Sequence, residues 1–185
     1  NRMPGRTGLY LSLTGASLTA SDALFLDLAD FFIEAQQKNN LLNALQQAAW
    51  NQDRWHNHAL LSKVLREFSH QTIAPLPASP VRAHYDFIQY ITDCDSVLEI
   101  QTRLNEADIS DTWVQKGRDA LNHGSPTTAH MVFELYRRAK HWSLKEVFQF
   151  ELGLSLQCCA HPDFPEGVRA LLVDKDNQPT WQPAT

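Results

Sequence analysis

The sequence predicts a mainly α-helical fold with little or no β-sheet. Apolar residues recur at helical spacing in one segment after another, and the segment 54–68 carries its leucine, valine and phenylalanine residues on one face. Helix-start signals precede other segments. Ser125 and Pro126 match an N-cap followed by a first-turn proline, and Ser143 with Glu146 matches a capping box. Periodicity and start signals therefore agree on helices.

The first third of the chain is predicted to contain short helices and one irregular stretch. Thr19 and Asp22 have the spacing of an N-cap and an acidic third residue. The segment 28–33 ends in aromatic and β-branched residues, which favours a brief extended piece. Residues 34–46 are rich in Gln and Asn and carry only a weak apolar stripe. We expect them to lead into the helix at 54–68.

Three prolines within residues 75–80 cannot continue a helix and predict a linker. The linker separates a predicted region 1–74 from a predicted helical subdomain 81–185. Helical spacing then returns in a series of segments. They are 87–94, 97–104, 113–121, 126–136 and 144–155, followed by a short helix at 165–173 and a polar tail at 174–179.

Composition narrows the possible partners. The formal net charge is −5, and no basic stripe interleaved with aromatics is present, so a nucleic-acid partner is not expected. No apolar run reaches the roughly 18 residues of a membrane span, so a membrane partner is not expected either. Cys94, Cys158 and Cys159 are odd in number and form no Cys-x-x-Cys, which favours a reducing, cytosol-like compartment.

Residue spacing gives little support to several common chemistries. His56 and His58 diverge by about 200° on a helix and lack a third ligand at suitable spacing, so no metal site is predicted. Gly-x-Ser-x-Gly, phosphate-loop and dinucleotide motifs are absent from the sequence. Cys158 could in principle pair with His123, His130 or His141, although capping or surface histidines are more common.

The C-terminal residues carry the most specific pattern. The run Asp163–Asp176, followed by Pro179-x-Trp181-x-Pro183, resembles the C-terminal signature of 3-hydroxyisobutyryl-CoA hydrolases, a branch of the enoyl-CoA hydratase/isomerase (crotonase) superfamily. The segment Leu11–Gly15 resembles the superfamily's Leu-x-Leu-Thr-Gly segment. Ser125-Pro126-Thr127, with Trp142-Ser143-Leu144 and Glu151-Leu152, resembles a helix pair of the hydrolase branch.

The resemblance implies that the chain is the C-terminal helical region of a crotonase-like α/β enzyme. Region 1–74 would then hold the end of the crotonase-like core and its connecting helices. The implied activity is hydrolysis of a short 3-hydroxyacyl-CoA, usually in valine breakdown, with CoA as part of the substrate and no separate cofactor. Phe164, Arg169 and Lys175 are the expected CoA contacts, because an aromatic ring can stack on adenine and a cation can meet phosphates. Each could equally be a core or solvated residue.

Two departures from the family pattern affect these expectations. Asp27 stands where the superfamily usually has glycine before its Leu-Ala/Val pair, and a left-handed helix end suits glycine better. The family's oxyanion-hole amides, Pro-Glu acid/base and Pro-Asp carboxylate precede the matched segment. No residue of this chain is therefore assigned a catalytic role, and we expect residues 1–185 alone to be inactive.

Two rival functions remain open at this stage: an enoyl-CoA hydratase or isomerase, and a non-catalytic helical interaction module. The expected compartment is the cytoplasm, or the mitochondrial matrix in a eukaryote. We also expect an open apolar face on the early helices, because a helix buries its stripe against a neighbour. That face would bind a missing N-terminal half or a second copy. Its expected residues are Leu9, Leu13, Leu24 and Leu28.

Overall fold

The computed structural model describes residues 3–72 and 75–183. Within these ranges the chain forms helices and no strand, with a helical content of 68%, which confirms the predicted fold class. The brief extended piece predicted at 28–33 is irregular chain in the structure. The described residues divide into two compact units, 18–83 and 3–17 with 84–183. They differ from the predicted 1–74 and 81–185 because residues 3–17 pack with the later helices.

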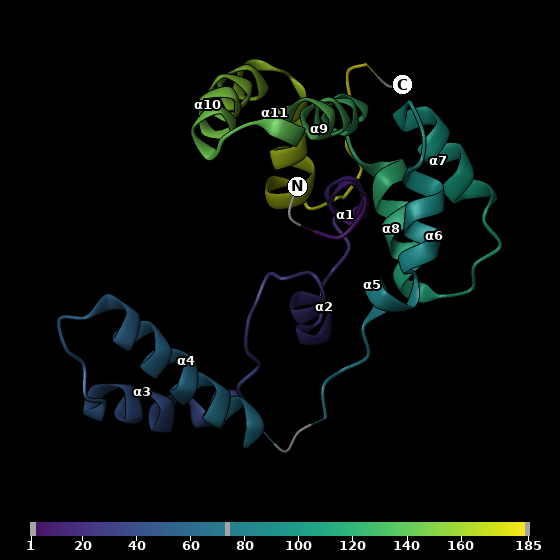
Figure 1. Cartoon of the computed structure of the whole chain (residues 1–185). Helices are drawn as coiled ribbons and strands as arrows, with labels where there is room; N and C mark the ends of the chain where they lie inside the picture. Colours follow the sequence, from purple (N-terminus) through teal and green to yellow (C-terminus); the bar gives the residue numbers. More distant parts are fainter. Residues whose placement is uncertain (1–2, 73–74, 184–185) are drawn as a thin grey trace. The chain divides into compact units, whose positions relative to one another are not determined.

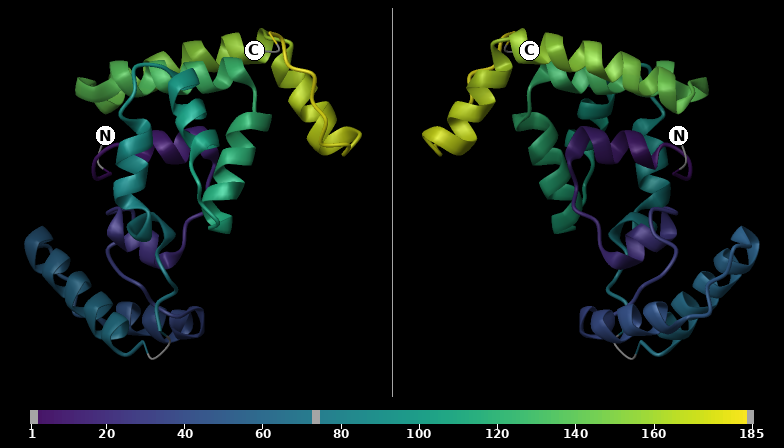
Figure 2. Two further views of the ribbon diagram at one scale, coloured as in Figure 1. Left: turned by 90° about the vertical axis from the view of Figure 1, so that its right-hand side faces the viewer. Right: turned by 90° about the vertical axis from the view of Figure 1, so that its left-hand side faces the viewer.

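The larger unit is built around α1 (Thr7–Thr14). This helix packs against α6 (Tyr85–Thr92), α8 (Thr112–His123) and α9 (Pro126–Arg138), and Figure 2 shows it among them. The remaining helices of the unit are α7 (Val97–Glu106), η2 (Ala139–His141), α10 (Leu144–Ala160), α11 (Asp163–Val168) and the π-helical turn η3 (Arg169–Val173), most of them labelled in Figure 1. Ser125 and Ser143 cap α9 and α10 as predicted.

The buried position of α1 corrects the prediction of an open leucine face. Leu9 is 2% exposed and Leu13 9% exposed, because three helices of the same unit surround them. Burying each leucine contributes about 1.5–3 kcal/mol. One exposed apolar stripe of this unit lies instead on α10, where four residues spaced by four positions are each more than 60% exposed. They are Leu144, Phe148, Leu152 and Leu156.

The smaller unit joins two helix pairs. Helix α3 (Lys38–Gln47), preceded by the short η1 (Ala35–Gln37), packs on α4 (Arg54–His70), and α2 (Ala20–Phe25) packs on α5 (Pro80–Ala83). In this unit Leu24 is half-buried and Leu28 is 52% exposed, so only Leu28 matches the predicted exposure fully.

Asp22 connects the two short helices of the smaller unit. Its Oδ2 accepts the backbone N–H of Thr19 at 2.8 Å, which completes the predicted capping box. Its Oδ1 accepts the hydroxyl of Ser79 at 2.6 Å and the N–H of Val81 at 3.1 Å. This fully buried carboxylate therefore fixes the residues on either side of Pro80. Helix α5 begins at Pro80, which is the last residue of the predicted linker.

Asp27 adopts a left-handed conformation with φ +55°. The superfamily's usual glycine would reach this conformation without the steric cost that a side chain adds. Asp27 therefore replaces the family's usual glycine at a position where the backbone is left-handed.

No helix among the described residues is both long enough and apolar enough to span a bilayer.

Candidate functional site

The candidate site lies at the C-terminal end of the larger unit, where an apolar groove runs between α9, α10 and α11. Its volume is about 640 Å³, and mainly carbon atoms line it. The hydrophobic part of the lining includes Met131, Phe164, Val168, Leu171 and Trp181. A groove of this size and character suits an elongated apolar ligand or ligand segment.

Arg169 organises the chain beyond the groove. Its guanidinium binds Glu166 through Nε–H···Oε2 and Nη2–H···Oε1, both 2.9 Å long. The same group donates to Asp174 and Asp176 at 2.7 Å and to the carbonyl of Gln178 at 3.1 Å. These contacts draw residues 174–178 back against α11. Hydrogen bonding to Glu166, then to the two aspartates, raises the pKa of Arg169 above its usual range.

Two carboxylates of this network, Glu166 and Asp176, are held in their ionised form. The side chain of Arg169, followed by the N–H of Thr180 at 2.7 Å, lowers the pKa of Glu166 to about 2. Hydrogen bonds from Arg169 and from the N–H of Gln178 also lower the pKa of Asp176. A charged hydrogen-bond donor favours the ionised carboxylate, so these two groups keep their charges well below neutral pH.

Asp163 ties the tail to the start of α9. Its Oδ2 accepts the hydroxyl of Ser125 at 2.5 Å, and its Oδ1 accepts the N–H of Gln182 at 2.8 Å. The residue is 8% exposed. Burial raises the pKa of Asp163, but hydrogen bonds from Ser125 and Gln182 outweigh it, so the pKa lies below its usual value. One buried carboxylate thus joins α9, α11 and the tail.

Two further contacts close residues 174–183 over the end of α8, and we call these residues the C-terminal strap. The indole N–H of Trp181 donates to the carbonyl of His123 at 2.9 Å, and Nε2 of His123 lies 2.8 Å from the carbonyl oxygen of Asn177. A Cβ on Gly167 would lie 3.3 Å from the Trp181 ring, so glycine allows the close packing of that ring.

The three predicted CoA contacts take different positions. Phe164 lines the groove and is 54% exposed, so its ring is accessible to a ligand. Arg169 lies outside the groove lining, with its guanidinium bound to carboxylates. Lys175 is exposed on the strap at φ +56°. Contact of these residues with CoA stays a prediction.

Two other groups considered from the sequence, Cys158 and His130, each contact a neighbouring residue. Sγ of Cys158 lies 3.8 Å from Sδ of Met131 in the groove wall, and Nδ1 of His130 lies 2.9 Å from the carbonyl oxygen of Pro126. Residues 3–72 and 75–183 contain no group of three or more His, Cys, Asp or Glu side chains arranged to hold a metal ion. Sequence reasoning missed the Ser125–Asp163 contact, although both residues belong to the motifs it singled out.

Known proteins resemble this chain over its whole length. A family model described as Enoyl-CoA hydratase/isomerase matches residues 1–185. The mitochondrial 3-hydroxyisobutyryl-CoA hydrolase of Gallus gallus is 32% identical over 184 residues, which are 99% of this chain and 46% of that protein. The Homo sapiens protein of the same name is 29% identical over 99% of this chain and 46% of its own length. The chain thus spans about half the length of these relatives.

Solved structures share the fold. An enoyl-CoA hydratase from Rhodobacter sphaeroides matches with a TM-score of 0.77 and 26% identity, covering 99% of this chain and 48% of that one. A carnitinyl-CoA dehydratase from Mycobacterium thermoresistibile matches with a TM-score of 0.79 and 26% identity, covering 100% and 48%. Both comparisons include the helices that form the groove and the strap.

Proposed function

Because the chain belongs to the enoyl-CoA hydratase/isomerase family, we propose that its protein hydrolyses the CoA thioester of a short 3-hydroxyacyl group. One observation carries the proposal: 32% identity to a 3-hydroxyisobutyryl-CoA hydrolase over 99% of the chain. Hydrolysis adds water across the thioester and yields a carboxylate and free CoA thiol. The proposed compartment is the cytoplasm, or in a eukaryote the mitochondrial matrix, in line with the names of the chicken and human relatives.

Residues 1–185 have a supporting role in this proposal. The groove would receive an apolar part of the acyl-CoA, with Phe164 as the accessible aromatic contact. Lys175 would meet a phosphate from the exposed strap, and Arg169 would hold the strap in position through its carboxylates. The amides that stabilise the oxyanion and the paired carboxylates that move protons would come from elsewhere in the intact protein.

A second candidate reaction is hydration of a 2-enoyl-CoA. The observation that favours it is the match to an enoyl-CoA hydratase and a carnitinyl-CoA dehydratase among solved structures. The two reactions leave different products, because hydration consumes the carbon–carbon double bond and leaves the thioester intact. Hydrolysis consumes the thioester and releases a thiol.

The test uses the intact protein and two substrates, 3-hydroxyisobutyryl-CoA and a short 2-enoyl-CoA. Free thiol is measured with a thiol reagent, and loss of the conjugated enoyl thioester by ultraviolet absorbance. We expect thiol release from the 3-hydroxyacyl substrate and little loss of enoyl absorbance. Loss of the enoyl signal without thiol release would assign the protein to the hydratase reaction instead.

A further inference from the structure

A second pocket, which we call the basic pocket, shares no lining residue with the apolar groove. Its volume is about 640 Å³, and it opens between the start of α1, the end of α6 and the end of α9. In contrast to the apolar groove, polar atoms make up more than half of its lining surface. Its charged and polar lining residues are Arg6, Thr92, Asp95, Tyr136, Arg137, Lys140 and His141.

Basic residues from two distant parts of the chain meet here. Arg6 immediately precedes α1, Arg137 lies in the last turn of α9, and Lys140 and His141 belong to η2. The pocket lining contains one acidic residue, Asp95. Since the whole chain carries a formal net charge of −5, this local excess of basic groups runs against the composition. Favourable interaction with the dipole of α9 explains a cation at Arg137, but it does not explain one at Arg6.

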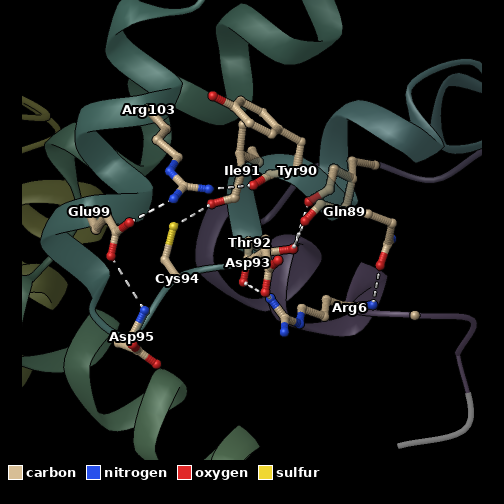
Figure 3. A network of polar contacts seen from close by, with 12 residues as sticks. Arg6, Gln89, Tyr90, Ile91, Thr92, Asp93, Cys94, Asp95, Glu99 and Arg103 are labelled. Carbon is tan, nitrogen blue, oxygen red and sulfur yellow. Dashed lines mark hydrogen bonds and ion pairs between the residues drawn. The ribbon is translucent and has the colours of Figure 1, made fainter.

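The basic groups are only partly neutralised by their neighbours. Figure 3 shows Arg6 directed at Asp93 and at the carbonyl of Thr92, the latter 3.0 Å away, with one guanidinium nitrogen, Nη1, making both contacts. Arg137 contacts Glu134 at 3.3 Å through Nη1. Lys140 forms no ion pair with any residue in 3–72 or 75–183, so its ammonium is available to a ligand.

The close-up also shows what holds the Arg6 side of the pocket in place. The N–H of Arg6 donates to Oε1 of Gln89 at 2.7 Å, and Gly5 adopts φ +58° just before it. A Cβ on Gly5 would come within 2.1 Å of Oε1 of Gln89, so any other residue would have to displace the Gln89 amide that accepts the N–H of Arg6. The start of α1 is therefore fixed to α6, and Arg6 is held at the pocket rather than free in solvent.

We infer that the basic pocket binds a phosphate group carried by a larger molecule. A guanidinium and an ammonium are the side chains that proteins use most for phosphate. The volume exceeds that of one phosphate and lies in the range of sites for nucleotide-sized ligands. The phosphate could belong to the nucleotide end of CoA or to a separate phosphorylated metabolite. Phosphate binding at this pocket does not depend on whether the protein is a hydrolase.

Titration of the 185-residue chain with inorganic pyrophosphate, at constant ionic strength, tests the inference by calorimetry. The test variant is Lys140→Gln, with Arg138→Gln as the matched control. Arg138 is also basic and lies two residues before Lys140, in the last turn of α9, but it does not line the pocket. We expect Lys140→Gln to weaken binding about five- to tenfold and Arg138→Gln to change it less than about twofold.

The second test variant is Arg137→Gln. Arg137 contacts Glu134, as the control residue Arg138 does, but Arg137 also lines the pocket. Arg137→Gln should therefore weaken binding as Lys140→Gln does. Circular dichroism verifies that each variant stays folded. Equal losses in the Arg138 and Lys140 variants, or no pyrophosphate binding by the unaltered chain, would overturn the inference. Competition by adenosine 3′,5′-bisphosphate, with none by adenosine, would assign the phosphate to CoA. Pyrophosphate binding without such competition would assign it to another phosphorylated metabolite.

Discussion

The contact between Tyr10 and Gly117 allows a quantitative test of how α1 packs on α8. Tyr10 is 1% exposed, and its hydroxyl oxygen has no hydrogen-bond partner within the described ranges. A Cβ on Gly117 would lie 2.8 Å from that oxygen and 3.3 Å from Cβ of Thr14. Alanine favours a helix over glycine by about 0.5–1 kcal/mol, whereas overpacking costs about 1–3 kcal/mol. Gly117→Ala should therefore destabilise the protein by about 1–2 kcal/mol.

The same substitution should behave differently when the hydroxyl is removed. In a Tyr10→Phe background the 2.8 Å contact no longer exists, so Gly117→Ala should be neutral or stabilise by up to about 1 kcal/mol. A double-mutant cycle measured by denaturant unfolding should thus give a coupling energy of about 1–3 kcal/mol. For a chain of this size, the loss of about 1–2 kcal/mol caused by Gly117→Ala alone corresponds to roughly 2–8 °C in melting temperature. Equal effects of Gly117→Ala in both backgrounds would refute this packing.

Tyr10 also predicts an alkaline pH dependence. Burial, followed by the charge of Asp111, raises its pKa to about 12. The phenol is neutral in both states below the unfolded pKa near 10, so stability is complete there. As pH rises from about 10 toward 12, the unfolded state loses its proton first and stability falls. Tyr10→Phe should remove this part of the alkaline loss, and parallel pH curves for the two proteins would contradict the burial argument.

Three further predictions concern the strap and the exposed helix. Arg169→Met should release the strap, seen as loss of the native Trp181 fluorescence environment, while α1 and its neighbours stay folded; an unchanged spectrum would show that the carboxylate contacts are dispensable. Because the pKa of Glu166 is lowered to about 2, its contribution to holding the strap is present above about 4.5 and lost as pH falls toward 2. Glu166→Gln should remove this acid transition, and its persistence would point to other groups. Residues 1–185 should self-associate in analytical ultracentrifugation through exposed side chains of α10, and Leu152→Gln should weaken association with little effect on stability; a monomer that binds no hydrophobic dye would contradict it.

Local sequence signals located the helices well because helix starts depend on neighbouring residues. The hydroxyls of Thr19 and Ser143 accept the N–H groups of Asp22 and Glu146, at the spacing that the sequence predicts. The burial of Leu9 could not be read from the sequence in the same way. It depends on which distant helices surround α1, and a periodic stripe does not specify the helix that will cover it.

In the candidate site, too, local motifs could be recognised from the sequence, whereas contacts that depend on how the chain turns back could not. Phe164 belongs to a recognisable motif and its ring is accessible, while its contact with CoA stays a prediction. The engagement of Arg169 by three carboxylates depends on the π-helical turn and on left-handed conformations at Lys175 and Asn177. These backbone features reverse the chain and bring Asp174 and Asp176 to the guanidinium. Composition and helical spacing carry no signal for such a turn, so the strap was not foreseen.

Thiol release from 3-hydroxyisobutyryl-CoA by the intact protein and by purified residues 1–185 is the decisive measurement for the proposed activity. We predict turnover by the intact protein and none above buffer background by residues 1–185, because the catalytic groups are proposed to lie outside them. Turnover by residues 1–185 that a single substitution within them abolishes would contradict this proposal. So would an intact protein that releases no thiol.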